Sequence, residues 1–192
     1  MTVRELILKN RSCRRFRQNE SVPKEHLRQL VDLARLSPSA SNLQPLKYIV
    51  SSDPKINAQI FPTLAWAGYL TDWPGPAEGE RPAAYIVILG DSTIKFPIDC
   101  DHGIAAQSIL LGAVEMGYAG CIIGSIKRDE LRKILTIPAH LEILLVLALG
   151  RCAESIVLEE VRADGDIRYW RDAHGVHHVP KRKLNEILIR EF

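Results

Sequence analysis

The sequence contains no apolar run long enough to cross a membrane. Its longest apolar stretches are interrupted by Gln107, Glu115 and Glu142, whereas a transmembrane helix needs about 20 consecutive apolar residues. The first ten residues, MTVRELILKN, alternate charged and apolar side chains and lack the apolar core and cleavage site of a secretory signal peptide. We therefore expect a cytoplasmic protein with no membrane partner.

Cysteines are few and widely spaced. Cys13, Cys100, Cys121 and Cys152 form no C-x-x-C pair, so their spacing indicates neither a zinc site nor an iron–sulfur cluster. We expect reduced, mostly buried thiols, including Cys13. Asp172 and the histidines after it could in principle bind a metal, but no helical frame or further carboxylate accompanies them, so no metal site is predicted.

Common nucleotide and hydrolase motifs are also missing. The chain has no Walker A sequence and no G-x-S-x-G elbow. Gly117, Gly120 and Gly124 do not have the G-x-G-x-x-G spacing, and they follow an expected helix instead of a strand. A Rossmann dinucleotide site is therefore excluded, and no Ser/His/Asp or paired-carboxylate arrangement predicts a catalytic side chain.

The composition is that of an ordinary globular domain, with 192 residues, 46% hydrophobic and 25% charged residues and a net charge of +2. So small a charge does not by itself indicate nucleic-acid binding, and no nucleic-acid partner is expected. Basic residues do cluster within residues 11–17 and again in the segment PKRK. A basic dimeric nucleic-acid-binding module therefore stays open as a rival interpretation.

Local patterns predict most of the helices and strands. Thr2 and Glu5 form a capping box that begins a helix running to about Lys9. Apolar spacing predicts a second helix with Pro23 in its first turn, which Pro38 stops. Further expected elements are strands at 47–50, 84–90 and 141–150, a helix from Asp99 or Asp101 to Gly117, and a polar helix in KRDELRKIL.

Two regions are less defined. Residues 54–80 are not assigned, and TDWPGPAEGERP is expected to be a surface loop or mobile lid. Residues 156–192 carry turn signals and a short amphipathic segment, which predict a hairpin and a short helix. The helix ending near Gly117 is apolar on almost every side, so we expect it to pack against a partner subunit as well as its own sheet.

Two polar segments are candidates for binding a ligand. NRSCRRF places several arginines beside Ser12, and arginine forks match phosphate oxygens, although an exposed basic turn would look the same. SPSASNLQPLKYIV, residues 37–50, sets hydroxyls and amides between two prolines before a strand. Such a loop turns the chain, but it can also line a site for a polar, planar ligand.

These two segments, followed by HGIAAQSILLGAVEMGYAGCIIG and LALGRCAES, resemble the FMN-dependent nitroreductase family in four blocks in the same order. The first two blocks match the family patterns R-S-x-R-x-F and P-S-x-x-N-x-Q-P-W, except that Leu46 replaces the Trp. The resemblance implies an α+β fold with a mixed, mainly antiparallel central sheet flanked by helices. It also implies an intertwined homodimer, with residues 1–155 as the FMN-binding core and residues 156–192 as an extension that packs on the core or the partner.

The resemblance also implies a cofactor site. Arg11, Ser12 and Arg14 correspond to contacts with the FMN phosphate and ribityl chain, and Arg151 to a second basic phosphate ligand. Ile123 and Gly124 correspond to the backbone N–H groups that face the flavin ring. The loop that reaches the flavin from the other subunit corresponds to Pro38, Ser39, Asn42 and Gln44.

The implied activity is that of an FMN-dependent oxidoreductase. It takes hydride from NADH or NADPH and reduces a small organic acceptor of the nitroaromatic, quinone or flavin type by a ping-pong mechanism. No catalytic side chain is required, because the cofactor carries the chemistry. Dehalogenation, flavin fragmentation and enone reduction in the same pocket stay open, as does a flavin carrier or sensor without turnover.

Overall fold

The computed structural model describes residues 1–192 and divides them into two compact units. The larger unit contains Met1–Trp66 and Pro74–Ala153, and the smaller unit contains Ala67–Trp73 and Glu154–Phe192. In chain order the elements are α1 (Val3–Lys9), α2 (Lys24–Arg35), η1 (Ala40–Asn42), β1 (Leu46–Ser51), α3 (Pro54–Ile60), η2 (Phe61–Thr63), β2 (Ala84–Asp91), α4 (Asp101–Glu115), β3 (Ala119–Ile123), α5 (Arg128–Ile134), β4 (Leu141–Gly150), β5 (Ile156–Glu160), β6 (Trp170–Arg171), β7 (His177–Lys181) and α6 (Leu184–Ile187). No helix combines the length and apolar character needed to cross a bilayer.

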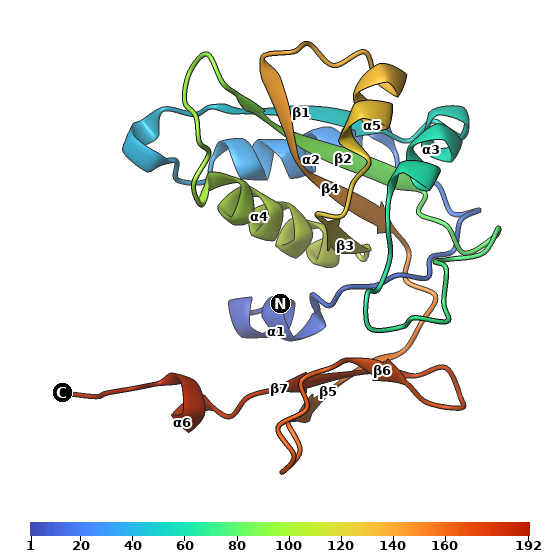
Figure 1. Cartoon of the computed structure of the whole chain (residues 1–192), viewed down its shortest axis with the longest axis vertical. Helices are drawn as coiled ribbons and strands as arrows, with labels where there is room; N and C mark the ends of the chain where they lie inside the picture. Colours follow the sequence, from blue (N-terminus) through green and yellow to red (C-terminus); the bar gives the residue numbers. More distant parts are fainter. The chain divides into compact units, whose positions relative to one another are not determined.

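The larger unit is built on a four-stranded sheet in the order β1-β2-β4-β3 (Figure 1). All three strand pairs are antiparallel. The α+β class is therefore confirmed, but the expectation of a mixed central sheet is wrong. Among the strands, parallel pairing occurs only between β5 and β7 in the smaller unit. In the larger sheet β2 and β3 run in the same direction, but β4 lies between them, so neighbouring strands are antiparallel.

Both faces of β2 are buried. Ala84, Ile86 and Ile88 face the core formed with α2 and α4, together with Leu147 and Leu149 of β4. Since side chains alternate along a strand, Tyr85, Val87 and Leu89 point to the opposite face. They are equally buried. This explains why the strand reads as a continuous apolar run in the sequence.

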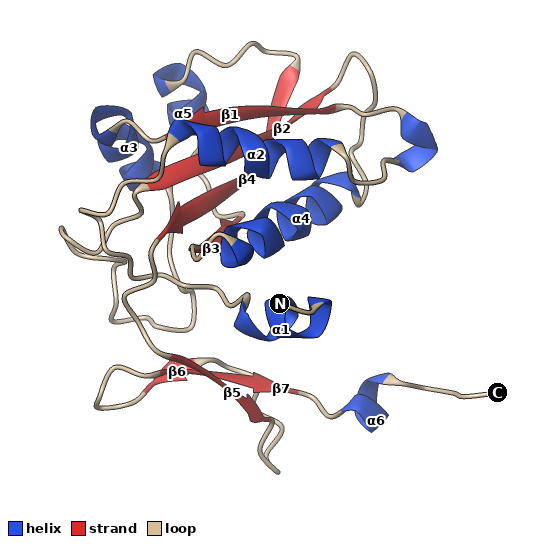
Figure 2. Cartoon of the chain, turned by 180° about the vertical axis from the view of Figure 1, so that it is seen from behind, coloured by secondary structure: helices blue, strands red, loops and turns tan.

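Helices α2 and α4 lie side by side against one face of this sheet (Figure 2). Of the apolar residues spaced for one face of α2, Leu27, Leu30 and Ala34 are buried, and Val31 is partly buried against the core. Pro23 is the N-cap of α2 and lies one residue outside its first turn. Cys100, not an aspartate, occupies the N-cap position of α4, and no side chain caps that helix end.

Helix α3 lies in the region that the sequence left unassigned. Asp53 caps it by accepting a hydrogen bond from Lys55 N–H at 2.8 Å, and Pro54 is its first residue. An N-cap aspartate followed directly by proline is a helix-start pattern. The sequence carries this signal, but the Pro- and Gly-rich stretch that follows it has no helical pattern and obscures the short helix. Residues 74–82 do form a loop, as expected.

The smaller unit contains a three-stranded sheet in the order β5-β7-β6. The antiparallel β6–β7 pair is the predicted hairpin, and α6 is the predicted short helix. Arg171 and Glu154 form a buried ion pair at 2.7 Å, and the Arg171 guanidinium lies 4.2 Å from the centre of the Trp73 ring. Residues 67–73 thus belong with the C-terminal sheet, which the sequence did not indicate.

Candidate functional site

The arginine-rich segment 11–17 is held against β3 and the residues that follow β4. Ser12 forms a parallel bridge with Gly120 of β3, and Cys13 N–H donates to the Gly120 carbonyl at 3.0 Å. On its other side, Arg17 N–H donates to the Arg151 carbonyl at 2.9 Å. These backbone bonds bring Arg11, Ser12 and Arg14 together with Arg151, although about 140 residues separate them.

Arg11 has spare hydrogen-bonding capacity. Its Nη2 donates to the Ile7 carbonyl at 2.8 Å, but its Nε is buried and has no hydrogen-bond partner. Burial also lowers the pKa of this guanidinium. A buried donor without an acceptor is unfavourable, so an anion that reaches Arg11 would satisfy a group that the chain leaves unpaired.

Arg151 is already engaged within the chain. Its Nη1 donates to the Gly117 carbonyl at 2.6 Å, and its guanidinium lies 4.7 Å from the centre of the Tyr118 ring. Glu20 also lies within 3.9 Å of its Nε. These contacts fix the side chain near the turn that follows α4, beside the segment that carries Arg11.

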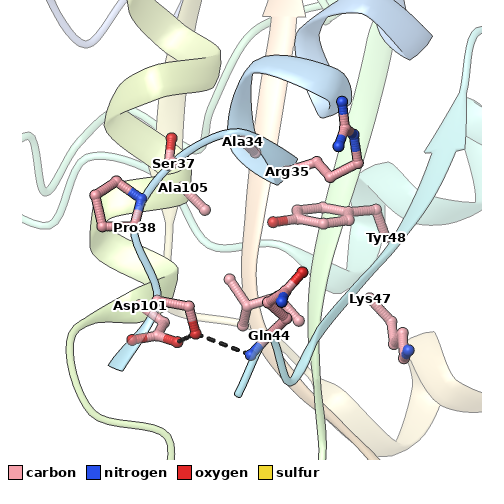
Figure 3. Close-up of a pocket in the computed structure, with 11 residues that line it drawn as sticks. Ala34, Arg35, Ser37, Pro38, Gln44, Lys47, Tyr48, Asp101 and Ala105 are labelled. Atoms are coloured by element: carbon pink, nitrogen blue, oxygen red, sulfur yellow. Dashed lines mark hydrogen bonds between the residues drawn. The ribbon is translucent and has the colours of Figure 1, made fainter. Parts of the chain in front are cut away.

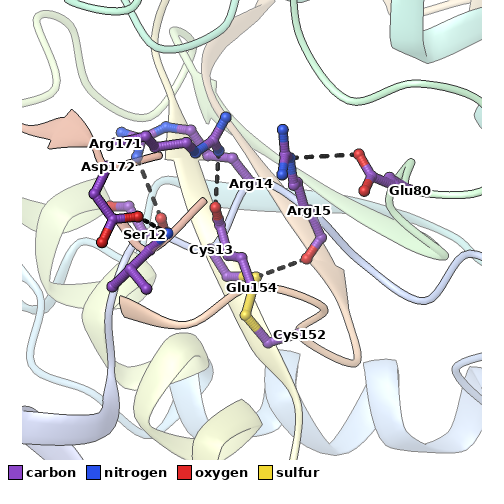
Figure 4. A network of polar contacts seen from close by, with 10 residues as sticks. Ser12, Cys13, Arg14, Arg15, Glu80, Cys152, Glu154, Arg171 and Asp172 are labelled. Atoms are coloured by element: carbon purple, nitrogen blue, oxygen red, sulfur yellow. Dashed lines mark hydrogen bonds and ion pairs between the residues drawn. A yellow bond between two sulfur atoms is a disulfide. The ribbon is translucent and has the colours of Figure 1, made fainter. Parts of the chain in front are cut away.

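A disulfide joins segment 11–17 to residues 151–153. Cys13 and Cys152 are bonded, with their Cα atoms 6.1 Å apart (Figure 4). The expectation of four reduced thiols is therefore wrong for this pair, whereas Cys100 and Cys121 form no disulfide. Spacing could not reveal the bond, because the two residues are 139 positions apart and meet only through the pairing of segment 11–17 with residues 151–153.

Ile123 and Gly124 lie where β3 ends. Ile123 is the last residue paired with β4, opposite Val146, and its side chain is buried. Gly124 follows it and is exposed. The backbone leaves the sheet at this point. Ile123 and Gly124 thus lie three and four residues after Gly120, the β3 residue that pairs with Ser12.

The loop 37–44 is anchored by a buried carboxylate. Asp101, the first residue of α4, accepts hydrogen bonds from Ser39 Oγ at 2.6 Å and from Ala40 N–H at 3.1 Å. Burial alone would raise the pKa of Asp101, but these hydrogen bonds and the nearby charges of Lys95 and His102 outweigh it, so the pKa is lowered. The carboxylate is thus kept ionised as the anchor of the loop.

This loop has an unusual backbone. Ser41, Asn42 and Gln44 all have positive φ values, between 51° and 54°. Left-handed conformations are unfavourable for residues other than glycine, and they concentrate at sites where function needs them. Asn42 and Gln44 are exposed, and Gln44 Nε2 donates to the Asn42 carbonyl and side-chain oxygen, each at 3.2 Å.

A cavity of about 230 Å³ lies beneath the loop (Figure 3). Pro38, Ser39 and Gln44 line it, together with Tyr48 of β1 and Asp101. Burial, assisted by the negative charge of Asp101, raises the pKa of Tyr48 to about 12. The phenol therefore stays protonated and can donate a hydrogen bond to a ligand in this cavity.

The loop 37–44 and the arginine-rich segment 11–17 lie at opposite ends of α4 (Figure 1). The loop is tied to Asp101 at the start of this helix, and Arg151 contacts Gly117 just after its end. Fifteen residues of α-helix span about 22 Å. Within one chain, the loop and the basic segment therefore do not form a single pocket.

Sequence reasoning missed two residues of this region. Asp101 was considered only as a helix cap, and Tyr48 only as part of a strand. The sequence gives no signal for the Asp101–Ser39 contact, because the residues are 62 positions apart and meet only when α4 packs beside the loop.

The fold and the basic segment identify the class of protein. The chain matches the Nitroreductase family model over residues 7–74 and 77–151, and it belongs to that family. It is 29% identical over 163 residues to a Methanothermobacter thermautotrophicus protein named "Putative NADH dehydrogenase/NAD(P)H nitroreductase", which covers 81% of this chain and 80% of that protein.

Solved structures agree with this assignment. A nitroreductase family protein from Clostridium difficile 630 has a TM-score of 0.64 and 26% identity, covering 80% of this chain and 86% of the other. A protein titled FMN-dependent nitroreductase from Clostridium difficile R20291 has a TM-score of 0.64 and 24% identity, covering 78% and 87%. The second likeness concerns the fold alone.

Proposed function

We propose that this protein is an FMN-dependent oxidoreductase that accepts hydride from NADH or NADPH and reduces a small organic acceptor of the nitroaromatic, quinone or flavin type. The observation that carries the proposal is the pairing of segment 11–17 with β3 and residues 151–153, which gathers Arg11, Ser12, Arg14 and Arg151. Family membership and the resemblance of four sequence blocks to FMN-dependent nitroreductases support the choice of cofactor.

The residues present fit a phosphate-bearing flavin. The buried Nε of Arg11 lacks an acceptor, and a phosphate oxygen is an acceptor of the right charge. Arg14, Arg151 and the Ser12 hydroxyl would hold the rest of the phosphate and the ribityl chain. The backbone N–H groups at Ile123 and Gly124 would face the polar edge of the ring.

We infer that the remaining contacts come from a second copy of the chain. Pro38, Ser39, Asn42 and Gln44 are too far from segment 11–17 to serve the same pocket, because they lie at the other end of α4. In a two-fold dimer, the loop of each subunit can complete the pocket of the other. Its left-handed backbone, anchored by Asp101, presents the amides in one fixed arrangement.

Bound FMN would supply the hydride and electron transfer. The chain's own contribution is to bind, orient and shield. Positive charge from Arg11 and Arg14 compensates the phosphate, and the N–H groups after β3 orient the ring. Since one pocket would serve the donor and the acceptor in turn, we expect ping-pong kinetics, and no acid or base side chain is assigned.

The test is a double substitution, Arg11→Ala with Arg14→Ala. The purified variant should be folded but should contain less than about a tenth of the wild-type FMN, since each charge-assisted hydrogen bond contributes about 1.5–3 kcal/mol. FMN content is measured by visible absorption after protein quantification. Wild-type protein should be yellow and should be bleached by NADH or NADPH.

The matched control is Arg17→Ala with Arg28→Ala. It removes the same charge from exposed positions, one of them in the same segment, and should retain FMN. Unchanged FMN content in the Arg11/Arg14 variant would contradict the assignment of the phosphate site. A colourless wild-type protein that binds DNA with a steep salt dependence would favour the nucleic-acid-binding interpretation instead.

A further inference from the structure

A second cavity lies in the larger unit, at the start of β2. Its volume is about 220 Å³, and it is lined by Gln18, Pro54, Asn57, Ala58, Phe61, Glu78, Arg81, Pro82, Ala83 and Tyr85. We call it the α3 cavity, because α3 and the residue after it form one wall. It shares no residue with the cavity beneath the loop 37–44, and none of the residues assigned to FMN lines it.

Two hydrogen-bond donors of this cavity have no acceptor. The Tyr85 side chain is 1% exposed, and its hydroxyl is buried without a partner. The Nε of Arg81 is likewise buried and unpaired. Burial raises the pKa of Tyr85, whereas the positive charge of Arg81 lowers it, and both residues line the same cavity. Buried donors without partners are rare, because they lose their hydrogen bonds to water.

The other buried polar groups here are already paired. Asn57 donates to the Ala83 carbonyl at 2.8 Å and accepts from the Ser51 hydroxyl at 2.7 Å. The Gln18 side-chain oxygen accepts from Gly79 N–H at 2.8 Å and from Arg81 N–H at 3.2 Å. The unmet demand of the cavity is therefore specifically for an acceptor that reaches Tyr85 and Arg81.

Charge and shape narrow the ligand further. The Arg81 guanidinium lies 4.4 Å from the centre of the Phe61 ring and is paired with Glu78 at 2.6 Å. The Glu78 side chain is 71% exposed and also accepts a hydrogen bond from Gln18 Nε2 at 2.8 Å, so a ligand carboxylate would compete with Glu78 for Arg81. The apolar lining residues are Pro54, Ala58, Phe61, Pro82 and Ala83. The cavity volume is below the roughly 300–1,000 Å³ of pockets for drug-sized ligands. These dimensions suit a single ring.

We propose that the α3 cavity binds a small aromatic carboxylate. One carboxylate oxygen accepts from the Tyr85 hydroxyl and the other from Arg81, while the ring lies against Phe61 and Pro82. The site is independent of FMN, because no residue assigned to the cofactor contributes to it.

The experiment is isothermal titration calorimetry with benzoate as the probe, on wild-type protein and three variants. Tyr85→Phe should weaken benzoate binding at least about tenfold, since it removes one hydrogen bond to a charged acceptor. Glu78→Gln should strengthen binding, because it removes the carboxylate that competes for Arg81. Tyr48→Phe, the same change in the other cavity, should leave binding unchanged. Neutral benzamide should bind more weakly than benzoate.

Two results would overturn the proposal. One is the absence of benzoate binding to the wild-type protein at millimolar concentration, which would mean that the cavity holds water only. The other is equal affinity in the wild type and in Tyr85→Phe. Should Tyr85→Phe not fold, Arg81→Gln provides the same test, because the Arg81 side chain is partly exposed and its replacement should also weaken binding.

Discussion

Asp101 shows how a single residue connects the sequence to the site. The residue is 4% exposed, and its carboxylate accepts hydrogen bonds from Ser39 and from the backbone of Ala40. A buried charge is tolerated only when hydrogen bonds compensate it, and here the compensating donors belong to the loop assigned to the flavin. The first residue of α4 therefore fixes the loop.

We predict that Asp101→Asn destabilises the protein by about 1–3 kcal/mol at pH 7, because a neutral amide replaces an ionised acceptor of two hydrogen bonds. The native pKa of Asp101 is lowered from 3.8. Its contribution is thus complete above that value and is lost as the pH falls through the lowered native pKa. The difference in free energy of unfolding between wild type and variant should therefore shrink below about pH 4.

Urea unfolding at pH 7 and pH 3 measures this difference. Asp99→Asn is the matched control, since Asp99 is exposed and pairs only with Lys95 on the surface. That variant should lose less than about 1 kcal/mol. An Asp101→Asn variant that is as stable as wild type at pH 7 would show that the carboxylate does not anchor the loop.

At the scale of elements, β3 is placed by a glycine. A Cβ atom at Gly120 would lie 2.9 Å from the Ala148 carbonyl oxygen of the neighbouring strand and would also meet the Leu110 side chain of α4. The backbone of β3 therefore lies closer to β4 and α4 than any side chain would allow. Ser12 pairs with this same residue, so the glycine also determines where the arginine-rich segment lies.

We predict that Gly120→Ala destabilises the FMN-free protein by about 1–3 kcal/mol, the usual cost of overpacking. The comparison variant is Gly124→Ala, because a Cβ there has only Leu145 Cδ2 nearby, at 3.9 Å. Thermal and urea unfolding of both variants measure the difference. Equal stability of the two variants would contradict the close packing at Gly120.

The elements themselves were largely predictable. The capping box of α1, the buried face of α2, the apolar α4 and the run that forms β4 all depend on neighbouring residues, which the sequence displays directly. The errors occurred where local signals competed or were absent. Asp53 and Pro54 mark the start of α3, but the irregular stretch that follows obscures this signal. The parallel pairing of β5 with β7 has no local signature.

At the scale of the whole molecule, the proposed site requires two chains. We predict that light scattering gives twice the 21.6 kDa of one chain. We also predict complementation between two defective variants, Arg11→Ala with Arg14→Ala and Asn42→Gly with Gln44→Gly. Glycine suits the positive φ values of the second pair, so only the side-chain amides are lost.

Each variant alone should bind FMN poorly. When both are refolded together in equal amounts, random pairing gives half mixed dimers, each with one intact site, so about a quarter of the wild-type FMN content should return. Refolding each variant separately and combining them immediately before measurement provides the control. A mass of one chain, or no recovery of FMN after joint refolding, would contradict the shared site.

The sequence by itself determined the family, most of the helices and strands and the identity of the basic and amide-rich segments, because these depend on residue types and short spacings. Only the tertiary structure decided that Cys13 bonds Cys152, that Asp101 holds the loop, and that the two segments lie at opposite ends of α4. Contacts between residues 62 to 139 positions apart depend on how the sheet and helices pack. No local pattern of side chains encodes that packing.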